Sequence, residues 1–237
     1  MSITILVPVL NRPQNAQRLV NSIEHGSSRE YQVVFLCSPG DTEEIKACSE
    51  TSATVHIVDF PNGPGDWAKK INRGMTLSTS EFVLLGADDL KFHPGWDNEA
   101  LRVARQTGAG VIGTNDLGNA TVMRGHHSTH PLVRRAYVEE FGTIDEPGLC
   151  LHEGYAHQWV DTELVETAKM RHRWAFAKES RVEHLHPFWK KGKMDSTYEK
   201  ALSTSKEDHA HFQERKQLWA RRSRDWTAER MRHDPVR

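Results

Sequence analysis

The sequence predicts an α/β fold, in which a mostly parallel central sheet carries helices on both faces. Short apolar runs alternate with segments of helical periodicity over the first 115 residues, and this alternation implies right-handed βαβ units. The apolar runs are continuous, as is typical of strands buried on both faces. The 237 residues allow one large domain or two small ones, and we expect a single domain.

The first βα unit shows the pattern clearly. Residues 3–9 form an apolar run that predicts a buried strand. Asn11 can cap the helix that follows, and proline at position 13 suits a first helical turn. One apolar face of that helix is formed by Ala16, Leu19, Val20 and Ile23.

The same alternation continues to residue 113. Further strands are expected at residues 31–37, 54–58, 81–86 and 109–113. A short helix is expected at residues 42–49. Two more helices are marked by regularly spaced apolar residues, which are Trp67, Ile71 and Met75 in one and Trp96, Ala100 and Val103 in the other.

The pattern changes after residue 115, where polar and histidine-rich segments dominate. A helix is expected around Val160, Leu164 and Ala168, and short strands at residues 174–178 and 181–185. From residue 196 onward we expect a polar helical tail. Residues 213–237 hold eight Lys and Arg against four acidic residues, which predicts a solvated helix face, with nucleic-acid or protein contact as the alternative.

Composition excludes several classes of protein. Lys and Arg total 31 against 32 Asp and Glu, a net charge of -1, so a strongly basic protein that coats nucleic acid is excluded. No apolar run approaches 18 residues, so no membrane span is expected. The N-terminus lacks the basic region of a signal peptide. The three cysteines are widely spaced and predict a reducing compartment, so we expect a cytoplasmic location.

Asp88 and Asp89 are the sharpest chemical feature. They follow the strand expected at residues 81–86, at the carboxyl edge of the sheet where such folds bind ligands. Adjacent carboxylates there must be hydrated, paired or bound to a cation, and hard divalent cations such as Mg²⁺ or Mn²⁺ take carboxylate oxygen together with phosphate. The alternative is that the two residues form a turn or cap the next helix.

Six segments, in consistent order, resemble motifs of family-two glycosyltransferases, which have the GT-A fold. They include a first strand and loop, a helix with an Ala-x-x-x-Asn-x-Gly pattern, a "DXD" segment, a segment with the catalytic acid and a late strand with histidines. The matching segments are residues 7–13, 67–74, 82–89 with 94–96, 141–146, 160–164 and 181–187. The resemblance implies a single GT-A domain, with a donor-binding half at residues 1–115, an acceptor and metal-closing half at 116–195, and the tail at 196–237.

The resemblance implies a metal-dependent glycosyltransferase that moves a sugar from a nucleotide-diphosphate sugar to an acceptor hydroxyl with inversion. Asp161 is then the general base that takes the acceptor proton, and Glu153 or Asp145 the fallback. Alternatively, Asp161 only caps the helix that begins at residue 162.

Site residues are implied by the resemblance as well. Donor contacts are expected from Pro8, Val9, Asn11, Arg12, Ser38, Lys69, Asn72, Ala87, Asp88 and Asp89. Mn²⁺ or Mg²⁺ is expected to bind to Asp89, His184 and His186. The two histidines share one face of a strand, and the alternative is that they form a hydrogen-bonded structural pair. His126, His127 and His130 are expected to be loop histidines, with binding of acceptor or metal as the alternative.

Two departures from the family pattern leave the identity of the substrates open. Ala87 stands where the DXD motif has its first acid. No acid directly follows the second strand, where residues 37–41 read Cys-Ser-Pro-Gly-Asp. The nucleotide base therefore stays open, with a UDP-sugar favoured over a GDP-sugar. The acceptor is open as well, and the alternatives are a protein, a glycan and a modified nucleic acid.

Two rival functions remain. A nucleotidyltransferase has a similar α/β layout but requires a glycine-rich, basic phosphate loop after the first strand, and residues 11–14 read Asn-Arg-Pro-Gln. The second rival is a sugar- or nucleotide-binding module without catalysis.

Overall fold

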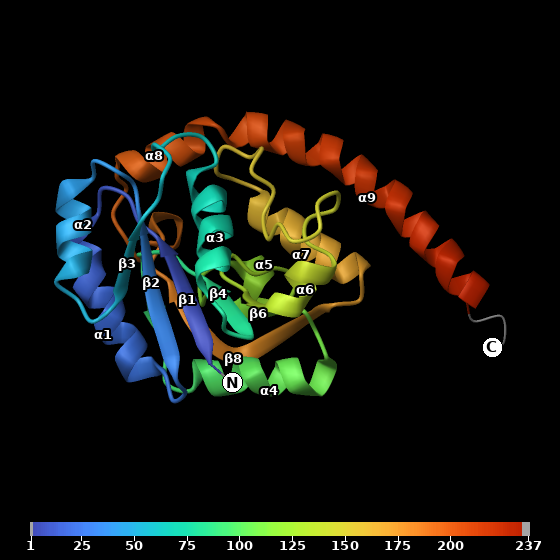
Figure 1. The fold of residues 1–237 in the computed structure, drawn as a ribbon, viewed down its shortest axis with the longest axis horizontal. Coiled ribbons are helices and arrows are strands. Elements are labelled where there is room, and N and C mark those ends of the chain that lie inside the picture. Colours follow the sequence, from blue (N-terminus) through green and yellow to red (C-terminus); the bar gives the residue numbers. More distant parts are fainter. Residues whose placement is uncertain (1, 234–237) are drawn as a thin grey trace.

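A mixed sheet runs through the centre of the molecule (Figure 1). The computed structural model describes the backbone of residues 2–233 and the side chains of residues 2–219. Within this part of the chain the sheet has eight strands in the order β3-β2-β1-β4-β7-β6-β8-β5. Their bounds are β1 Ile3–Pro8, β2 Tyr31–Cys37, β3 Thr54–Ile57, β4 Phe82–Leu85, β5 Leu90–Phe92, β6 Val111–Asn115, β7 Leu132–Arg134 and β8 Trp174–His184.

Most strands of this sheet point in one direction. β1 pairs in parallel with β2 and with β4, β2 with β3, and β6 with β8. β7 lies antiparallel between β4 and β6, and β5 is antiparallel to β8 at the edge. The predicted mostly parallel sheet is therefore confirmed, with two short antiparallel strands added.

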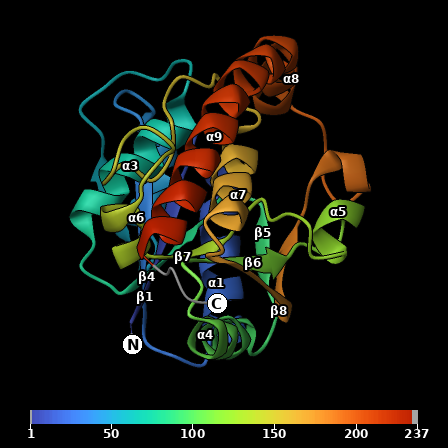
Figure 2. The ribbon, with the colours of Figure 1, turned by 90° about the vertical axis from the view of Figure 1, so that its right-hand side faces the viewer.

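Helices cover both faces of the sheet (Figures 1 and 2). One buried cluster joins the sheet to α1, α2 and α4, and a second joins it to α3, α6, α7 and α9. The bounds are α1 Ala16–Gly26, α2 Thr42–Ser49, α3 Asp66–Leu77, α4 Trp96–Thr107, α5 Ala120–Met123, α6 Arg135–Glu140, α7 Val160–Met170, α8 Ser196–Ser203 and α9 Ser205–His233.

β1 shows why its apolar run is continuous. Ile3, Ile5 and Val7 belong to the first cluster, and Leu6 between them belongs to the second. Since successive side chains of a strand point to opposite faces, a sheet covered on both sides buries every position of the strand, and the one hydroxyl of β1, on Thr4, is hydrogen-bonded to Ser78 and Ser80.

Some elements escaped the sequence prediction. β5 and β7 have three residues each, and α5 and α6 only four and six, so none shows a full hydrophobic period. The two strands expected at 174–178 and 181–185 are one continuous strand, β8: its first part pairs with β6 and its last part with β5, and the register with β6 shifts between Phe176 and Arg181.

The C-terminal tail is helical, as predicted, but its first part is not a free solvated helix. Phe212 and Trp219 of α9 are buried in the second core cluster, and Figure 2 shows α9 lying beside α7. The basic residues from Arg221 onward lie outside the part of the chain whose side chains the structure describes.

A buried ion cluster ties α9 to the domain. The guanidinium of Arg215 donates to both carboxylate oxygens of Glu163 at 2.7 Å and to both oxygens of Asp145 at 3.0 and 2.8 Å. Tyr155 donates its hydroxyl to Glu163 as well, at 2.7 Å. Arg215 and Glu163 are 5% and 3% exposed, so the charges depend on one another for stability.

We expect Arg215→Ala to lower the free energy of unfolding by about 3 kcal/mol or more, because it leaves Glu163 as a buried charge without its cation. Urea denaturation followed by circular dichroism measures the change. The matched control is Arg102→Ala, which breaks a half-exposed pair with Glu99 and should cost under about 1 kcal/mol. Equal losses in the two variants would refute the role given to the buried cluster.

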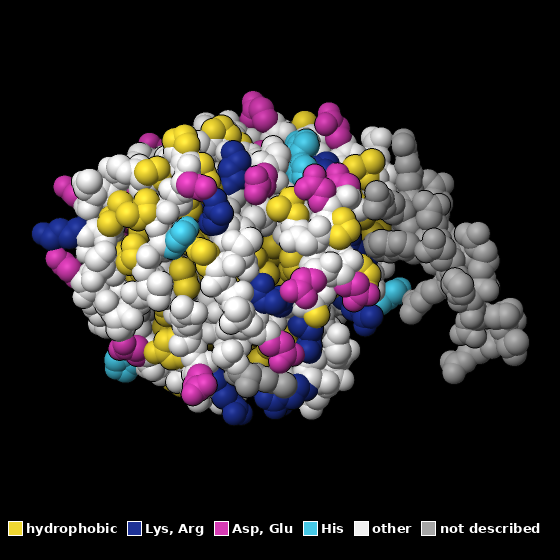
Figure 3. Space-filling model, in the orientation of Figure 1, with side chains coloured by type: hydrophobic (Ala, Val, Ile, Leu, Met, Phe, Trp, Pro, Cys, Tyr) yellow, Lys and Arg dark blue, Asp and Glu magenta, His cyan; other side chains and the backbone are white. Residues whose placement is uncertain are grey.

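Charges on the surface agree with the near-neutral composition. Acidic and basic side chains are interspersed on the face seen in Figure 3. Among residues 2–233, no helix is both long and apolar enough to cross a membrane.

Candidate functional site

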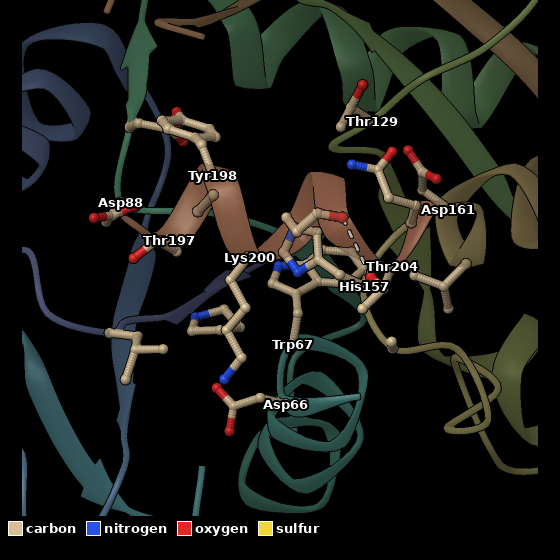
Figure 4. A pocket seen from close by; sticks show the side chains of 18 of the residues that line it. Asp66, Trp67, Asp88, Thr129, His157, Asp161, Thr197, Tyr198, Lys200 and Thr204 are labelled. Carbon is tan, nitrogen blue, oxygen red and sulfur yellow. Dashed lines mark hydrogen bonds between the residues drawn. The ribbon is translucent and has the colours of Figure 1, made fainter. Parts of the chain in front are cut away.

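A cavity of about 290 Å³ lies beyond the carboxyl ends of β1, β4 and β8. The loop before α7, the start of α3 and residues along α8 form its other walls. This is where parallel α/β sheets bind ligands. Figure 4 shows Asp88 and Tyr198 toward one end of the cavity, Asp161 and Thr129 toward the other, and Trp67 and His157 between them.

The acid pair owes its place to the turn at Gly86. The amide of Gly86 donates to the carbonyl of Leu6 in β1 at 2.8 Å. A β-carbon on Gly86 would lie 2.8 Å from that oxygen, so glycine alone lets the chain pass this close to β1. Asp88 and Asp89 then follow at the cavity wall, only 5% and 6% exposed.

Asp88 is held by groups of the first βα unit. It accepts from the guanidinium of Arg12 at 3.2 Å and from the side-chain amide of Asn15 at 2.9 Å. Burial and the neighbouring Asp89 raise the pKa of Asp88 to about 6. Arg12 is therefore the residue that balances the acid pair on this side.

Asp89 has one satisfied and one unsatisfied carboxylate oxygen. Oδ2 lies 3.2 Å from Nε2 of His184 and accepts the hydroxyl of Tyr198, whereas the buried Oδ1 has no hydrogen-bond partner. Although burial opposes the charge, His184 and Tyr198 hold the pKa of Asp89 well below its usual value. An ionised carboxylate with a free buried oxygen is a suitable ligand for a hard cation.

Three histidines gather beside Asp89. The ring of His184 lies 4.8 Å from that of His130 and 4.9 Å from that of His186. Burial alone would lower the pKa of His184, but Asp89 outweighs it and raises the pKa. Burial and the neighbouring His184 lower the pKa of His186 to about 4 and that of His130 to about 3. His130 lies in the loop between α5 and β7, as expected, and it is buried with its Nε2 unpartnered.

Asp161 lines the far end of the cavity from the first turn of α7. The helix begins at Val160 and its N-cap is Trp159, with φ of 70°, so the alternative that Asp161 caps the helix is wrong. Oδ1 of Asp161 accepts the amide of Thr162 at 2.8 Å, and Oδ2 lies 3.2 Å from Nε2 of His127.

α8 covers the cavity and contacts the acid pair. Asp195, the N-cap of α8, accepts from Arg12 at 2.8 and 2.9 Å. The ring of Tyr198 packs 4.2 Å from the guanidinium of Arg12, and its hydroxyl donates to Asp89. Lys200 also lines the cavity, so a helix expected to be part of a polar tail forms one wall of the site.

The structure brings most, but not all, of the expected site residues to this cavity. It is lined by Pro8, Val9, Arg12, Ala87, Asp88, Asp89, Asp161, His184 and His186. Of the others, Lys69 donates to the carbonyl of Pro64 at 2.9 Å, and Asn72 donates to the carbonyl of Leu151 at 2.8 Å. The amide of Asn11 donates to Asp41 at 2.9 Å, and Ser38 is buried with an unpartnered hydroxyl. Donor contacts from these four stay predictions.

Sequence reasoning missed residues that reach the site from distant segments. Tyr198 and Asp195 follow the last expected strand, and Asp208 of α9 accepts the backbone amides of residues 156–158 at 2.6 to 2.9 Å. The Asp-Ser-Thr sequence at 195–197 is a helix-start signal, but it does not say where the helix packs. The fallback bases Glu153 and Asp145 lie outside the cavity lining, paired with Asn72 and Arg215.

Comparison with known proteins gives a consistent family. Residues 4–173 match the family model described as glycosyl transferase family 2. No protein with a curated description matches the sequence.

Solved structures share the fold at low sequence identity. S. aureus TarS 1-349 superposes with a TM-score of 0.55 at 16% identity, covering 77% of this chain and 59% of that one. The mannosyltransferase PcManGT from Pyrobaculum calidifontis, in complex with GDP-Man and Mn²⁺, gives 0.57 at 14% identity, covering 77% and 56%. The chain thus spans little more than half the length of these structures.

Proposed function

Because the chain belongs to glycosyl transferase family 2, we propose that it transfers a sugar from a nucleotide-diphosphate sugar to an acceptor hydroxyl. The observation that carries the proposal is the cavity itself, which has the Asp88–Asp89 pair at one end and Asp161 at the other. Such a separation suits a reaction in which the leaving diphosphate and the attacking hydroxyl lie on opposite sides of one sugar carbon.

The donor class is supported by the proteins that share the fold. One structure of S. aureus TarS 1-349 contains UDP-GlcNAc, and PcManGT contains GDP-Man. We propose a nucleotide-sugar donor for this chain, with UDP favoured over GDP. Pro8, Val9 and Arg12 on β1 and its following loop, with Asp88, would contact it.

A divalent cation, Mn²⁺ or Mg²⁺, fits the residues around Asp89. Among the side chains that the structure describes, no cluster of three or more His, Cys, Asp or Glu is arranged to hold a metal. The expected set of Asp89, His184 and His186 is thus not preformed as a three-ligand site. The free Oδ1 of Asp89 and the imidazole of His184 would be the protein ligands, with His186 beside them and donor phosphates completing the shell. When bound, the cation would stabilise negative charge on the leaving diphosphate. Since Asp89 raises the pKa of His184, a cation has to displace its proton, and affinity should fall as pH falls.

The remaining roles belong to Asp161 and to two basic residues of the cavity wall, Arg12 and Lys200. The carboxylate of Asp161 takes the proton of the acceptor hydroxyl while the acceptor oxygen bonds to the anomeric carbon and the bond to the diphosphate breaks. A single displacement of this kind inverts the configuration at that carbon. Arg12 is held by Asp88 and Asp195 near the expected diphosphate, and Lys200 on α8 is a second cation at the cavity wall.

For the acceptor and for the cellular location we propose only a class. We propose an acceptor hydroxyl on a protein, a glycan or a modified nucleic acid, and a cytoplasmic location in which Cys37, Cys48 and Cys150 stay free thiols.

A thermal-shift screen tests the proposal. The full chain is heated with UDP, GDP, other nucleotides and common sugar nucleotides, each with and without Mn²⁺. We expect a rise in Tm with one nucleoside diphosphate or its sugar, larger when Mn²⁺ is present. No shift with any nucleotide would count against a donor site in this cavity.

A further inference from the structure

His127 and Asp161 form a pair that no sequence pattern predicts. His127 lies in the loop between α5 and β7, 34 positions before Asp161 in the chain. Its Nε2 lies 3.2 Å from Oδ2 of Asp161, and the two side chains are 14% and 20% exposed. The contact is therefore a largely buried hydrogen bond between two groups that can both carry charge.

Only one member of the pair faces the cavity. Asp161 lines it, whereas His127 is absent from the lining even though its loop neighbours Thr129 and His130 contribute to it. A substrate hydroxyl in the cavity can reach the carboxylate but not the imidazole. His127 therefore contacts Asp161 without lining the cavity, as a group that orients a base does.

The loop that carries His127 is firmly held. The hydroxyl of the next residue, Ser128, accepts the amide of Thr114 in β6 at 3.1 Å, and Ser128 is fully buried. On the other side, Lys169 of α7 donates to the carbonyl of His126. The loop that carries the imidazole is thus held between β6 and α7, the helix that carries Asp161.

We propose that His127 is a positioning residue for sugar transfer, which donates its Nε2–H to Asp161 and keeps that carboxylate ionised and directed into the cavity. The inference rests on the proposed function, in which Asp161 is the base. During transfer the acceptor proton moves to Asp161 and the proton on Nε2 of His127 stays where it is. After the product leaves, Asp161 returns its proton to water.

The charges around the pair agree with this role. Burial works against both charges, yet His127 outweighs it and lowers the pKa of Asp161, while Asp161 raises the pKa of His127. His130 also interacts with Asp161, but burial lowers the pKa of His130 to about 3, so it is uncharged at neutral pH. Around His127, Lys169 opposes the imidazolium and Asp116 favours it. His157 is a further titratable group that interacts with Asp161.

His127→Gln tests the proposal through the pH profile of turnover. The measurement is release of nucleoside diphosphate from the donor, with water or the acceptor as the second substrate. We expect kcat at neutral pH to fall about 10-fold to 100-fold with an unchanged donor KM, as when the orienting partner of a functional group is lost. The acid limb should move to higher pH, because burial then raises the pKa of Asp161 without an opposing imidazolium.

The control is His126→Gln, which changes the histidine next in the chain and should leave the profile unchanged. If His127→Gln lowers Tm but leaves the acid limb in place, His127 is merely structural and the proposal is overturned. An inactive wild-type chain would instead refute the proposed function.

A second measurement does not depend on turnover. The NMR signal of His127 is the imidazole resonance missing from the spectrum of His127→Gln. It should titrate above the usual histidine range in the wild-type chain and at lower pH in Asp161→Asn. A titration that Asp161→Asn leaves unchanged would show that the pair does not form.

Discussion

Asp161→Asn is expected to lower turnover by about 10²-fold to 10⁴-fold, the usual contribution of a general base, while donor binding is retained. Asparagine has nearly the same shape and its oxygen can still accept the amide of Thr162, as Oδ1 of Asp161 does at 2.8 Å. It cannot take a proton at neutral pH. Turnover is measured as nucleoside diphosphate released, and donor affinity by calorimetry.

Glu166→Gln is the matched control, since it neutralises a carboxylate on the same helix that does not line the cavity. It should leave turnover within about twofold of the wild type, like most substitutions away from a site. Turnover of Asp161→Asn within a factor of ten of the wild type would move the base elsewhere. Asp66 at the start of α3, which also lines the cavity, would then be the next residue to test.

Asp89→Ala is expected to abolish the part of nucleotide affinity that depends on Mn²⁺. The substitution removes a carboxylate of the cavity whose buried Oδ1 has no hydrogen-bond partner and whose Oδ2 lies 3.2 Å from Nε2 of His184. We expect the Kd for UDP with Mn²⁺ to rise at least about tenfold, equivalent to about 1.4 kcal/mol, and to approach the value without metal. Isothermal titration calorimetry with and without Mn²⁺ measures both.

Because Asp89 also accepts the hydroxyl of Tyr198, Asp89→Asn serves as a second variant that keeps the size of the side chain. Asp59→Ala is the control, because it removes a surface carboxylate that pairs with Arg73. If either Asp89 variant is folded and binds UDP with Mn²⁺ at wild-type affinity, the ligand assignment is contradicted.

The part of the fold that sequence reasoning predicted well is the part with long regular patterns. The strands β1, β2 and β4 each carry a continuous apolar run, and the helices α1, α3 and α4 each carry a full apolar period, so most elements of residues 3–107 were predicted one by one. The short strand β7 escaped because it has three residues and no period of its own. It is fixed by its pairing with β4 and β6, which is a tertiary effect.

Residues of the site, too, were predicted only where a local sequence pattern places them. Asp88, Asp89 and His184 were predicted because each follows or lies on a recognisable strand, and strand ends converge at one edge of a sheet. Tyr198 and the contact of His127 with Asp161 were not. These residues lie on a tail helix and in a loop, whose placement depends on packing rather than on local pattern. The side chain of Asn72 donates to the carbonyl of Leu151 and accepts its amide, and the donor contact expected from Asn72 stays a prediction.

The measurement that tests the central claim most directly is metal-dependent release of UDP or GDP from sugar nucleotides by the full chain. We predict release from at least one common sugar nucleotide with Mn²⁺, its loss when the metal is chelated, and its recovery when Mn²⁺ is restored. Absence of release from every common UDP- and GDP-sugar, with Mn²⁺ or Mg²⁺ present and the chain folded, would contradict the assignment of this cavity to sugar transfer.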